Sequence, residues 1–181
     1  MKAVCHTVKV KEANRGGRLY SAIHTEELEN GSVIFLGALE EGEMEIRKAV
    51  VPTTELIAKE TPMLVMNAEM IYDESTKSKQ ALGNYTNVAN KAFAVVPLSQ
   101  FDEIELSKEA FTGQTPSVGK FVVAKNGTAK WEVVNSAPGE GHVLVGKITS
   151  KRNSHLPVFV GGDGNMFPQA YELFNVAFTR A

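Results

Sequence analysis

Short runs of β-forming residues, separated by glycine, proline and asparagine turns, are the feature that most constrains how this chain can fold. The clearest example is the segment GKFVVAKNGTAKWEVV, residues 119–134, in which two β-rich runs flank Asn126-Gly127. Asparagine and glycine suit the two positive-φ positions of a type I′ turn, so the segment predicts a β-hairpin with a two-residue turn. The period of two places Phe121 and Val123 on one face of its first strand.

Further segments have the same character, which predicts a mainly β fold, a compact β-sandwich or a barrel-like domain. These segments are Ser32–Leu39, Met44–Val51, Pro62–Ala68, Lys91–Leu98, Glu103–Ser107, His142–Ser150, Leu156–Val160 and Leu173–Thr179. Helical signals are confined to a few short stretches. Asp73–Leu82 predicts a short exposed helix with an N-terminal cap, and Thr25–Leu28 and Pro168–Tyr171 predict single turns.

Length and composition favour one domain with an appended arm. The chain has 181 residues, 43% of them hydrophobic and 22% charged, close to the average of globular proteins. Residues 1–20 are more polar than the rest and contain Gly16-Gly17. We therefore expect an extended N-terminal arm over residues 1–20 and a single β-rich domain over residues 21–181.

The charge balance argues against a nucleic-acid partner. Lys and Arg number 19 against 21 Asp and Glu, giving a net charge of -2, whereas proteins that bind phosphate backbones usually carry a positive surplus. The longest apolar runs, such as Val33–Leu36 and Val143–Val145, are too short to cross a bilayer, and the N-terminus has no signal-peptide core. The single cysteine, Cys5, suits synthesis in a reducing cytoplasm.

Two loops match part of a ligand-binding motif. Gly141–Lys147 has the spacing of a phosphate-binding loop, but Ile148 follows where that motif needs Ser or Thr, and the β-branched interior favours a strand. Gly161–Asn165 alternates Asp163 and Asn165 as a calcium loop does, but it lacks the remaining ligands. We interpret the first segment as a strand and the second as a turn.

The remaining polar groups do not assemble a catalytic motif in the sequence. No two histidines lie close enough for a local metal pair, Cys5 sits in the expected arm, and the acidic run of residues 40–45 reads as a hairpin turn. A small basic cluster lacks interleaved aromatic residues. The histidines are His6, His24, His142 and His155, and the basic cluster is Lys147, Lys151 and Arg152. We predict no catalytic, cofactor-binding or metal-binding residue and no cofactor.

An ordered series of short segments over residues 25–135 resembles a group of tailed-phage virion proteins that includes head decoration proteins. The series comprises Leu28-Glu29-Asn30-Gly31, Leu36-Gly37, Glu41-Gly42-Glu43, Pro52, residues 70–74, Leu82, Tyr85-Thr86-Asn87, Ala89, Phe101–Leu106, Glu109-Ala110-Phe111 and Gly119–Val122. The family tends to have Gly-Asp before the strand at Phe101, where this chain has Ser99-Gln100. Residues 155–181 lie outside the resemblance.

The resemblance implies a non-enzymatic capsid decoration protein that binds and stabilises the outer surface of a phage head. Its expected partners are the major capsid protein and further copies of itself, as a trimer or another cyclic homo-oligomer, with no nucleic acid and no membrane. Two alternatives remain: another virion structural role, in the tail or in head completion, and a small β-barrel ligand-binding protein or hydrolase.

Overall fold

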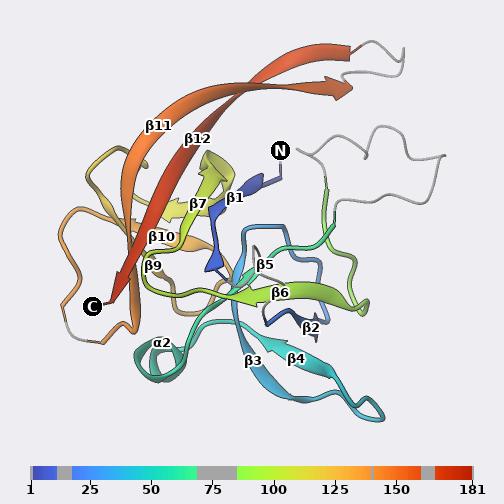
Figure 1. Ribbon diagram of the computed structural model, residues 1–181. Coiled ribbons are helices and arrows are strands. Elements are labelled where there is room, and N and C mark those ends of the chain that lie inside the picture. The colour runs from blue at the N-terminus through green and yellow to red at the C-terminus, as the bar shows by residue number, and fades with distance from the viewer. Residues whose placement is uncertain (1, 12–17, 69–84, 140, 160–165, 181) are drawn as a thin grey trace.

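The computed structural model describes residues 2–11, 18–68, 85–139, 141–159 and 166–180, with backbone alone for 155–159, 166–169 and 180. Strands dominate this part of the chain and form two units, a closed five-stranded barrel and a seven-stranded sheet (Figure 1). The mainly β prediction is therefore confirmed. The barrel-like alternative describes one of the two units, and the second unit is an open sheet.

The barrel has the strand order β2-β4-β3-β5-β6, with β2 and β4 parallel and the other neighbours antiparallel. Its strands are β2 (Tyr20–Ile23), β3 (Val33–Leu39), β4 (Ile46–Val50), β5 (Met63–Val65) and β6 (Phe93–Pro97). Alternation along β3 divides its side chains between two cores. Ile34 packs inside the barrel with Val95, whereas Val33 and Phe35 belong to the larger core shared with the sheet.

The seven-stranded sheet has the order β1-β7-β12-β11-β9-β10-β8. Its strands are β1 (Cys5–Lys9), β7 (Glu103–Ser107), β8 (Phe111–Gly113), β9 (Phe121–Ala124), β10 (Trp131–Val134), β11 (Leu144–Phe159) and β12 (Met166–Arg180). One face packs on the barrel through buried residues such as Leu106, Trp131 and Phe178. The opposite face carries half-buried or exposed polar residues such as Glu105 and Arg152, as expected for a sheet with one face in solvent, and all neighbouring strands are antiparallel except β8 and β10.

One α-helix, α2 (Thr54–Lys59), and one 3-10 turn, η3 (Lys108–Ala110), are present among the described residues. The hydroxyl of Thr53 caps α2 by accepting a hydrogen bond from the Leu56 amide at 3.3 Å, and Ile57 is buried. The sequence analysis missed this helix because a six-residue helix with one buried position has almost no periodic signal. Of the expected helical stretches, 73–82 lies outside the described residues, 25–28 is not helical, and 168–171 belongs to β12.

The predicted hairpin at Asn126-Gly127 exists, but the prediction of a two-residue type I′ turn was wrong. Ala124 pairs with Trp131, so six residues, 125–130, connect β9 to β10. A positive φ occurs at Gly127 (+78°) and not at Asn126, which fits a type II turn. Contacts outside the hairpin select the longer loop. The Gly127 amide donates to the Pro52 carbonyl at 2.9 Å, and the Val33 amide donates to the Ala129 carbonyl at 2.8 Å.

The N-terminal residues that the structure describes are part of the sheet rather than a free arm. Residues of β1 pair with β7, and Val4 and Val10 on either side of it are fully buried. Two buried acceptors hold this segment. The Val4 amide donates to Ser107 Oγ at 3.0 Å, and the Lys11 amide donates to Asp102 Oδ1 at 3.0 Å. The polar appearance of residues 1–20 was misleading because β1 is an edge strand, whose outer side faces water.

Strands β11 and β12 are longer than the sequence indicated. The expected strands 142–150 and 156–160 are one continuous β11 of 16 residues, paired with a 15-residue β12 over its whole length. The break expected between Ser150 and Leu156 is absent, and Pro157 lies opposite Pro168 in the ladder. Two facing prolines are tolerated where neither amide would point toward the other strand, so the ladder continues through them.

Candidate interaction surfaces

Residues from two separate segments of the resembling series, Leu28–Gly31 and Tyr85–Asn87, meet in a buried polar network. Leu28 forms a bridge with Asn87, and the Asn87 side chain donates to the Leu28 carbonyl at 3.0 Å and to Asn30 Oδ1 at 3.1 Å. The hydroxyl of Tyr85 lies 3.3 Å from Asn87 Oδ1, and Asn30 Oδ1 also accepts from the Asn67 amide at 3.1 Å. These side chains connect loops that are more than fifty residues apart, so their role is to hold the fold together.

Gly31 lies where the barrel meets the sheet. Its carbonyl accepts a hydrogen bond from the indole Nε1 of Trp131 at 2.9 Å, and its amide donates to the Val65 carbonyl at 2.8 Å. Its φ of +85° favours glycine, and a Cβ at this position would stand 2.8 Å from Leu106 Cδ2 and 3.0 Å from Cys5 Cβ. The Asn30-Gly31 motif therefore encodes a close approach of strands from both units.

Where the structure describes them, the segments considered as possible ligand-binding loops form a strand and a turn. Leu144 to Lys147 lie in β11, and the Val143 amide donates to the Ile57 carbonyl at 3.0 Å, so these amides do not converge on a common point. Residues 40–45 connect β3 to β4 as a turn with Gly42 at φ +81°, as expected. The calcium-like segment 161–165 lies outside the described residues.

The described histidines do not gather at one site with the cysteine and acidic residues. Across the described ranges, no three His, Cys, Asp or Glu side chains are grouped so as to hold a metal ion. Cys5 is half-buried in β1, His6 is its neighbour on that strand, and His24 Nδ1 accepts from the Glu26 amide at 3.1 Å. Burial lowers the pKa of His142, and within the described part of the chain its Nδ1 has no hydrogen-bond partner. The His155 side chain is not described.

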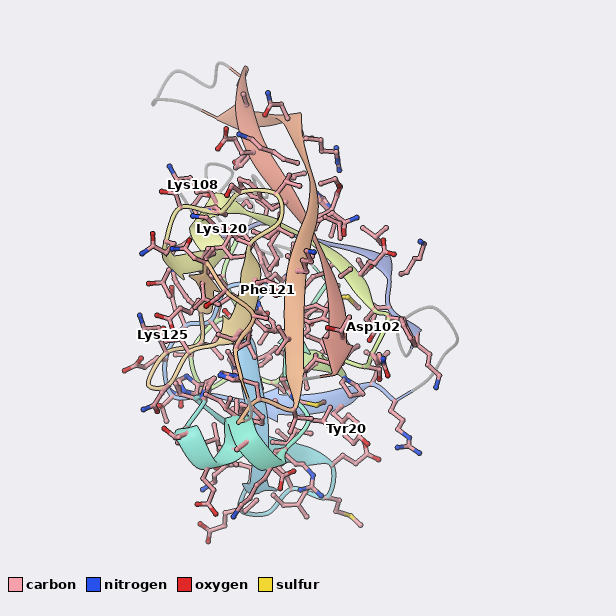
Figure 2. All side chains as sticks on the ribbon, turned by 90° about the vertical axis from the view of Figure 1, so that its left-hand side faces the viewer. Tyr20, Asp102, Lys108, Lys120, Phe121 and Lys125 are labelled. Atoms are coloured by element: carbon pink, nitrogen blue, oxygen red, sulfur yellow. The ribbon has the colours of Figure 1, made fainter. Side chains whose placement is uncertain are left out.

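The basic cluster is largely neutralised by acidic neighbours on the wet face of the sheet. Arg152 on β11 reaches over β12 to Glu105 on β7, with Nε–Oε1 and Nη2–Oε2 distances of 2.6 and 2.5 Å. Lys151 pairs with Glu172, and Lys147 Nζ lies 5.7 Å from the centre of the Phe121 ring, which Figure 2 shows on β9. Because the Arg152 hydrogen bond stabilises the charged carboxylate, the pKa of Glu105 is lowered. The cluster therefore offers little net positive charge to an anionic partner.

A pocket of about 360 Å³ opens at the barrel, and residues from every barrel strand line it. The lining residues are Arg18, Tyr20, Phe35, Leu36, Arg47, Glu60, Thr61, Met63 and Pro97. They include no cysteine, serine or histidine, and Tyr20, Glu60 and Thr61 are the lining residues with acid–base or nucleophilic groups. Arg47 Nη1 donates to the Gly37 carbonyl at 3.1 Å, so part of that guanidinium is committed to the barrel.

Phe101 is an exposed aromatic side chain on a strained turn. It is 75% exposed and has φ +73°, a region that bulky residues rarely adopt. The turn is rigid because the buried Asp102 carboxylate accepts from the Ser99 amide at 2.7 Å and from the Lys11 amide at 3.0 Å. Positive φ at the third position of residues 99–102 is the pattern of a type II turn, where glycine is usual. The turn therefore keeps the Phe101 side chain exposed to solvent although its backbone conformation is strained. Such strain at an exposed residue suggests that Phe101 contacts a binding partner.

The ends of β11 and β12 form what we call the distal ribbon, residues 155–159 paired with residues 166–170. β9 pairs with β11 at Gly146 and Lys147, and β7 pairs with β12 at residues 173–177, so in the described part of the chain no third strand reaches the ribbon. Both views show the ribbon projecting beyond the body (Figures 1 and 2). At roughly 3.3 Å per residue, it extends about 17 Å past Ser154.

Comparison with known protein families, characterised proteins and solved structures finds no match to this chain. Among the described residues, no helix has both the length and the hydropathy needed to cross a bilayer. The functional reading therefore rests on the chain itself: its internal framework, the Phe101 turn and the distal ribbon. Sequence reasoning missed both surface features. For the Phe101 turn, the only signal in the sequence was Ser99-Gln100, where the phage proteins that the chain resembles tend to have Gly-Asp. For the distal ribbon, the only signal was the apolar run around Pro157.

Proposed function

We propose that this protein is a non-enzymatic decoration protein that binds the outer surface of a tailed-phage head and stabilises it. Its partners in this proposal are the major capsid protein and further copies of itself in a cyclic homo-oligomer. A decoration protein needs a rigid body and exposed contact residues, because weak contacts repeated over a symmetric lattice give strong retention. A barrel packed on a sheet, with protruding apolar groups, meets these needs.

One observation carries the proposal. The segments that resemble phage virion proteins are scattered over residues 25–135, yet their members converge in space. Leu28 pairs with Asn87 across 59 residues, and Gly31 lies close against Leu106 of the Phe101–Leu106 segment. The convergence supports the idea that the series encodes a common scaffold, and with it the head-protein assignment.

Phe101 is the residue that we assign to the capsid contact. Aromatic side chains are enriched at the centres of interfaces, where burial in a pocket of the partner provides much of the binding energy. The buried Asp102 carboxylate holds the turn from both sides, so little entropy is lost when Phe101 docks. A rigid, exposed ring is thus suited to a repeated lattice contact.

The test is binding to purified heads that lack the protein. The wild-type protein should co-sediment with heads in many copies per particle and should remain accessible to antibodies on the outside. Phe101→Gly should reduce binding by roughly tenfold or more while leaving the body folded, because an interface aromatic typically contributes more than about 1.4 kcal/mol. Val118→Gly is the matched control, since Val118 is also exposed (58%) but lies in another loop.

The outcomes separate the remaining alternatives. Failure of the wild-type protein to co-sediment with heads would overturn the decoration proposal. A few copies at one vertex would instead favour a head-completion or tail role. Equal binding by the Phe101→Gly and Val118→Gly variants would remove Phe101 from the contact but leave the decoration proposal standing.

A further inference from the structure

The interior of the five-stranded barrel changes from apolar to charged at one end. Its middle is filled by a buried apolar cluster that includes Ala22 on β2 and Ala49 on β4. Side chains on one face of a strand recur every two residues, so the next inward positions are Tyr20 and Arg47. Both residues line the pocket of about 360 Å³. The pocket is therefore a mouth of the barrel, a place where barrel proteins commonly bind small ligands.

A β-bulge in the neighbouring strand holds Arg47 at this mouth. Leu36 pairs with Ala49 and Leu39 pairs with Arg47, so β3 has one more residue than β4 between the two pairs. A bulge interrupts the ladder, and here the Gly37 carbonyl accepts the 3.1 Å hydrogen bond from Arg47 Nη1. Within the described part of the chain, Nε and Nη2 of Arg47 make no hydrogen bond. One nitrogen thus fixes the guanidinium, and the other two remain for a ligand.

The charged groups of the pocket do not neutralise one another. Arg18 and Arg47 are its cations, and Glu60, the C-cap residue of α2, is its anion. Among the residues that the structure describes, neither Arg47 nor Glu60 takes part in an ion pair. Two guanidiniums and one carboxylate give the lining a formal charge of +1. A ligand with a single negative charge would balance it.

We propose that the barrel mouth binds a small organic carboxylate that carries an apolar or aromatic body. Nε and Nη2 lie on one side of the guanidinium and match the two oxygens of a carboxylate. Tyr20, Leu36 and Met63 supply an apolar wall for the body of the ligand. A carboxylate brings one negative charge, whereas a phosphate monoester brings about 1.5 to 2 at neutral pH. This inference concerns the isolated protein and does not rest on capsid binding.

The first test uses phenylacetate as the probe, with binding followed by an NMR saturation-transfer titration. Phenylacetamide has the same body without the charge, and phenyl phosphate carries the larger charge. The wild type should bind phenylacetate with a dissociation constant of about 1 mM or below, and phenylacetamide roughly tenfold more weakly. Absence of saturable phenylacetate binding, equal affinity for the acid and the amide, or tighter binding of phenyl phosphate would overturn the proposal.

The second test locates the bound carboxylate. Arg47→Gln should weaken phenylacetate binding by roughly tenfold or more, because it removes a bidentate, charge-assisted contact. Lys48→Gln is the matched control. It removes the same charge from the next residue of β4, whose side chain lies on the other face of the strand and pairs with Glu40 at 3.7 Å. The control should bind like the wild type, and equal losses in the two variants would contradict a site at the mouth.

Glu60→Gln gives a decisive result even if Arg47→Gln does not fold. It removes the one negative charge of the lining and should strengthen phenylacetate binding roughly threefold. The Glu60 side chain is exposed, and its backbone amide keeps the 2.8 Å bond to the Leu56 carbonyl that ends α2. Circular dichroism checks that each variant is folded. Affinity of Glu60→Gln no higher than that of the wild type would overturn the proposal. Neither result would bear on whether the protein binds heads.

Discussion

The indole Nε1 of Trp131 donates a hydrogen bond of 2.9 Å to the carbonyl of Gly31, joining strand β10 of the sheet to the loop that opens barrel strand β3. Trp131 is 1% exposed and its ring packs against Phe178, with ring centres 5.3 Å apart. A buried indole without an acceptor would be costly, so this bond ties the position of the loop to the packing of the sheet. The two units therefore behave as one cooperative body.

Gly31→Ala is expected to destabilise the protein by about 3 kcal/mol, because it combines a strained φ with overpacking. The new Cβ would meet Leu106 Cδ2 at 2.8 Å and Cys5 Cβ at 3.0 Å at φ +85°. Gly42→Ala is the control, with φ +81° but nothing within 4 Å, and should cost about 1 kcal/mol. Urea unfolding measures both, and equal losses for the two variants would contradict the close approach at Gly31.

Phe101→Gly is expected to stabilise the isolated protein by about 1 kcal/mol, because it relieves the positive φ of a bulky residue that is 75% exposed. Phe101→Ala removes the ring but keeps the strain, so its stability should stay close to that of the wild type. Thermal unfolding of the three proteins provides the comparison. A glycine variant no more stable than the alanine variant would show that the turn is not strained.

Glu105→Gln is expected to reduce stability by about 1 kcal/mol at neutral pH, because it breaks a bidentate, partly exposed ion pair with Arg152. The hydrogen bond from Arg152 is the main cause that lowers the pKa of Glu105 in the folded state, with the charge of Arg152 adding to it. A lowered folded pKa means that the stabilisation is present above the unfolded value, about 4.3, and is lost as the pH falls through the folded value.

The difference in unfolding free energy between the wild type and Glu105→Gln should therefore shrink as the pH is lowered below about 4. Glu55→Gln is the control, since its pair with Lys59 on α2 is more exposed, with 75% and 68% of the two side chains open to water. The control should show a smaller loss at neutral pH. A Glu105→Gln deficit that persists undiminished in acid would mean that the carboxylate charge is not the source.

Replacing both Pro157 and Pro168 with valine is expected to promote self-association through the edges of the distal ribbon. The two valines restore the outward amides at the centre of each ribbon edge, so a neighbouring strand can add along a continuous ladder. Sedimentation at increasing concentration should reveal larger species than the wild type forms. Pro138→Val, in a loop, is the matched control. If the double variant sedimented like the wild type, the prolines would not protect the edges.

The sequence by itself determined where most barrel and sheet strands lie. Glu103–Ser107 was predicted with the bounds that β7 has, and 32–39 and 44–51 contain β3 and β4. The reason is local: a strand with one buried face repeats its pattern every two residues, and turn residues mark its ends. The same logic predicted the acidic turn at residues 40–45 and the strand after Gly141.

Only the tertiary structure decided the features on which the function is argued. The loop after Lys125 is long because Gly127 and Ala129 bond to Pro52 and Val33, which no local pattern encodes. Phe101 adopts a glycine conformation because the Asp102 carboxylate accepts hydrogen bonds from the Ser99 amide within the turn and from the Lys11 amide, 91 residues away in the sequence. The N-terminal residues join the sheet because the Val4 amide donates a hydrogen bond to the buried Ser107 hydroxyl. Strand order, barrel closure and the distal ribbon depend on contacts between residues far apart in the chain, and their energies appear only when the whole chain has packed.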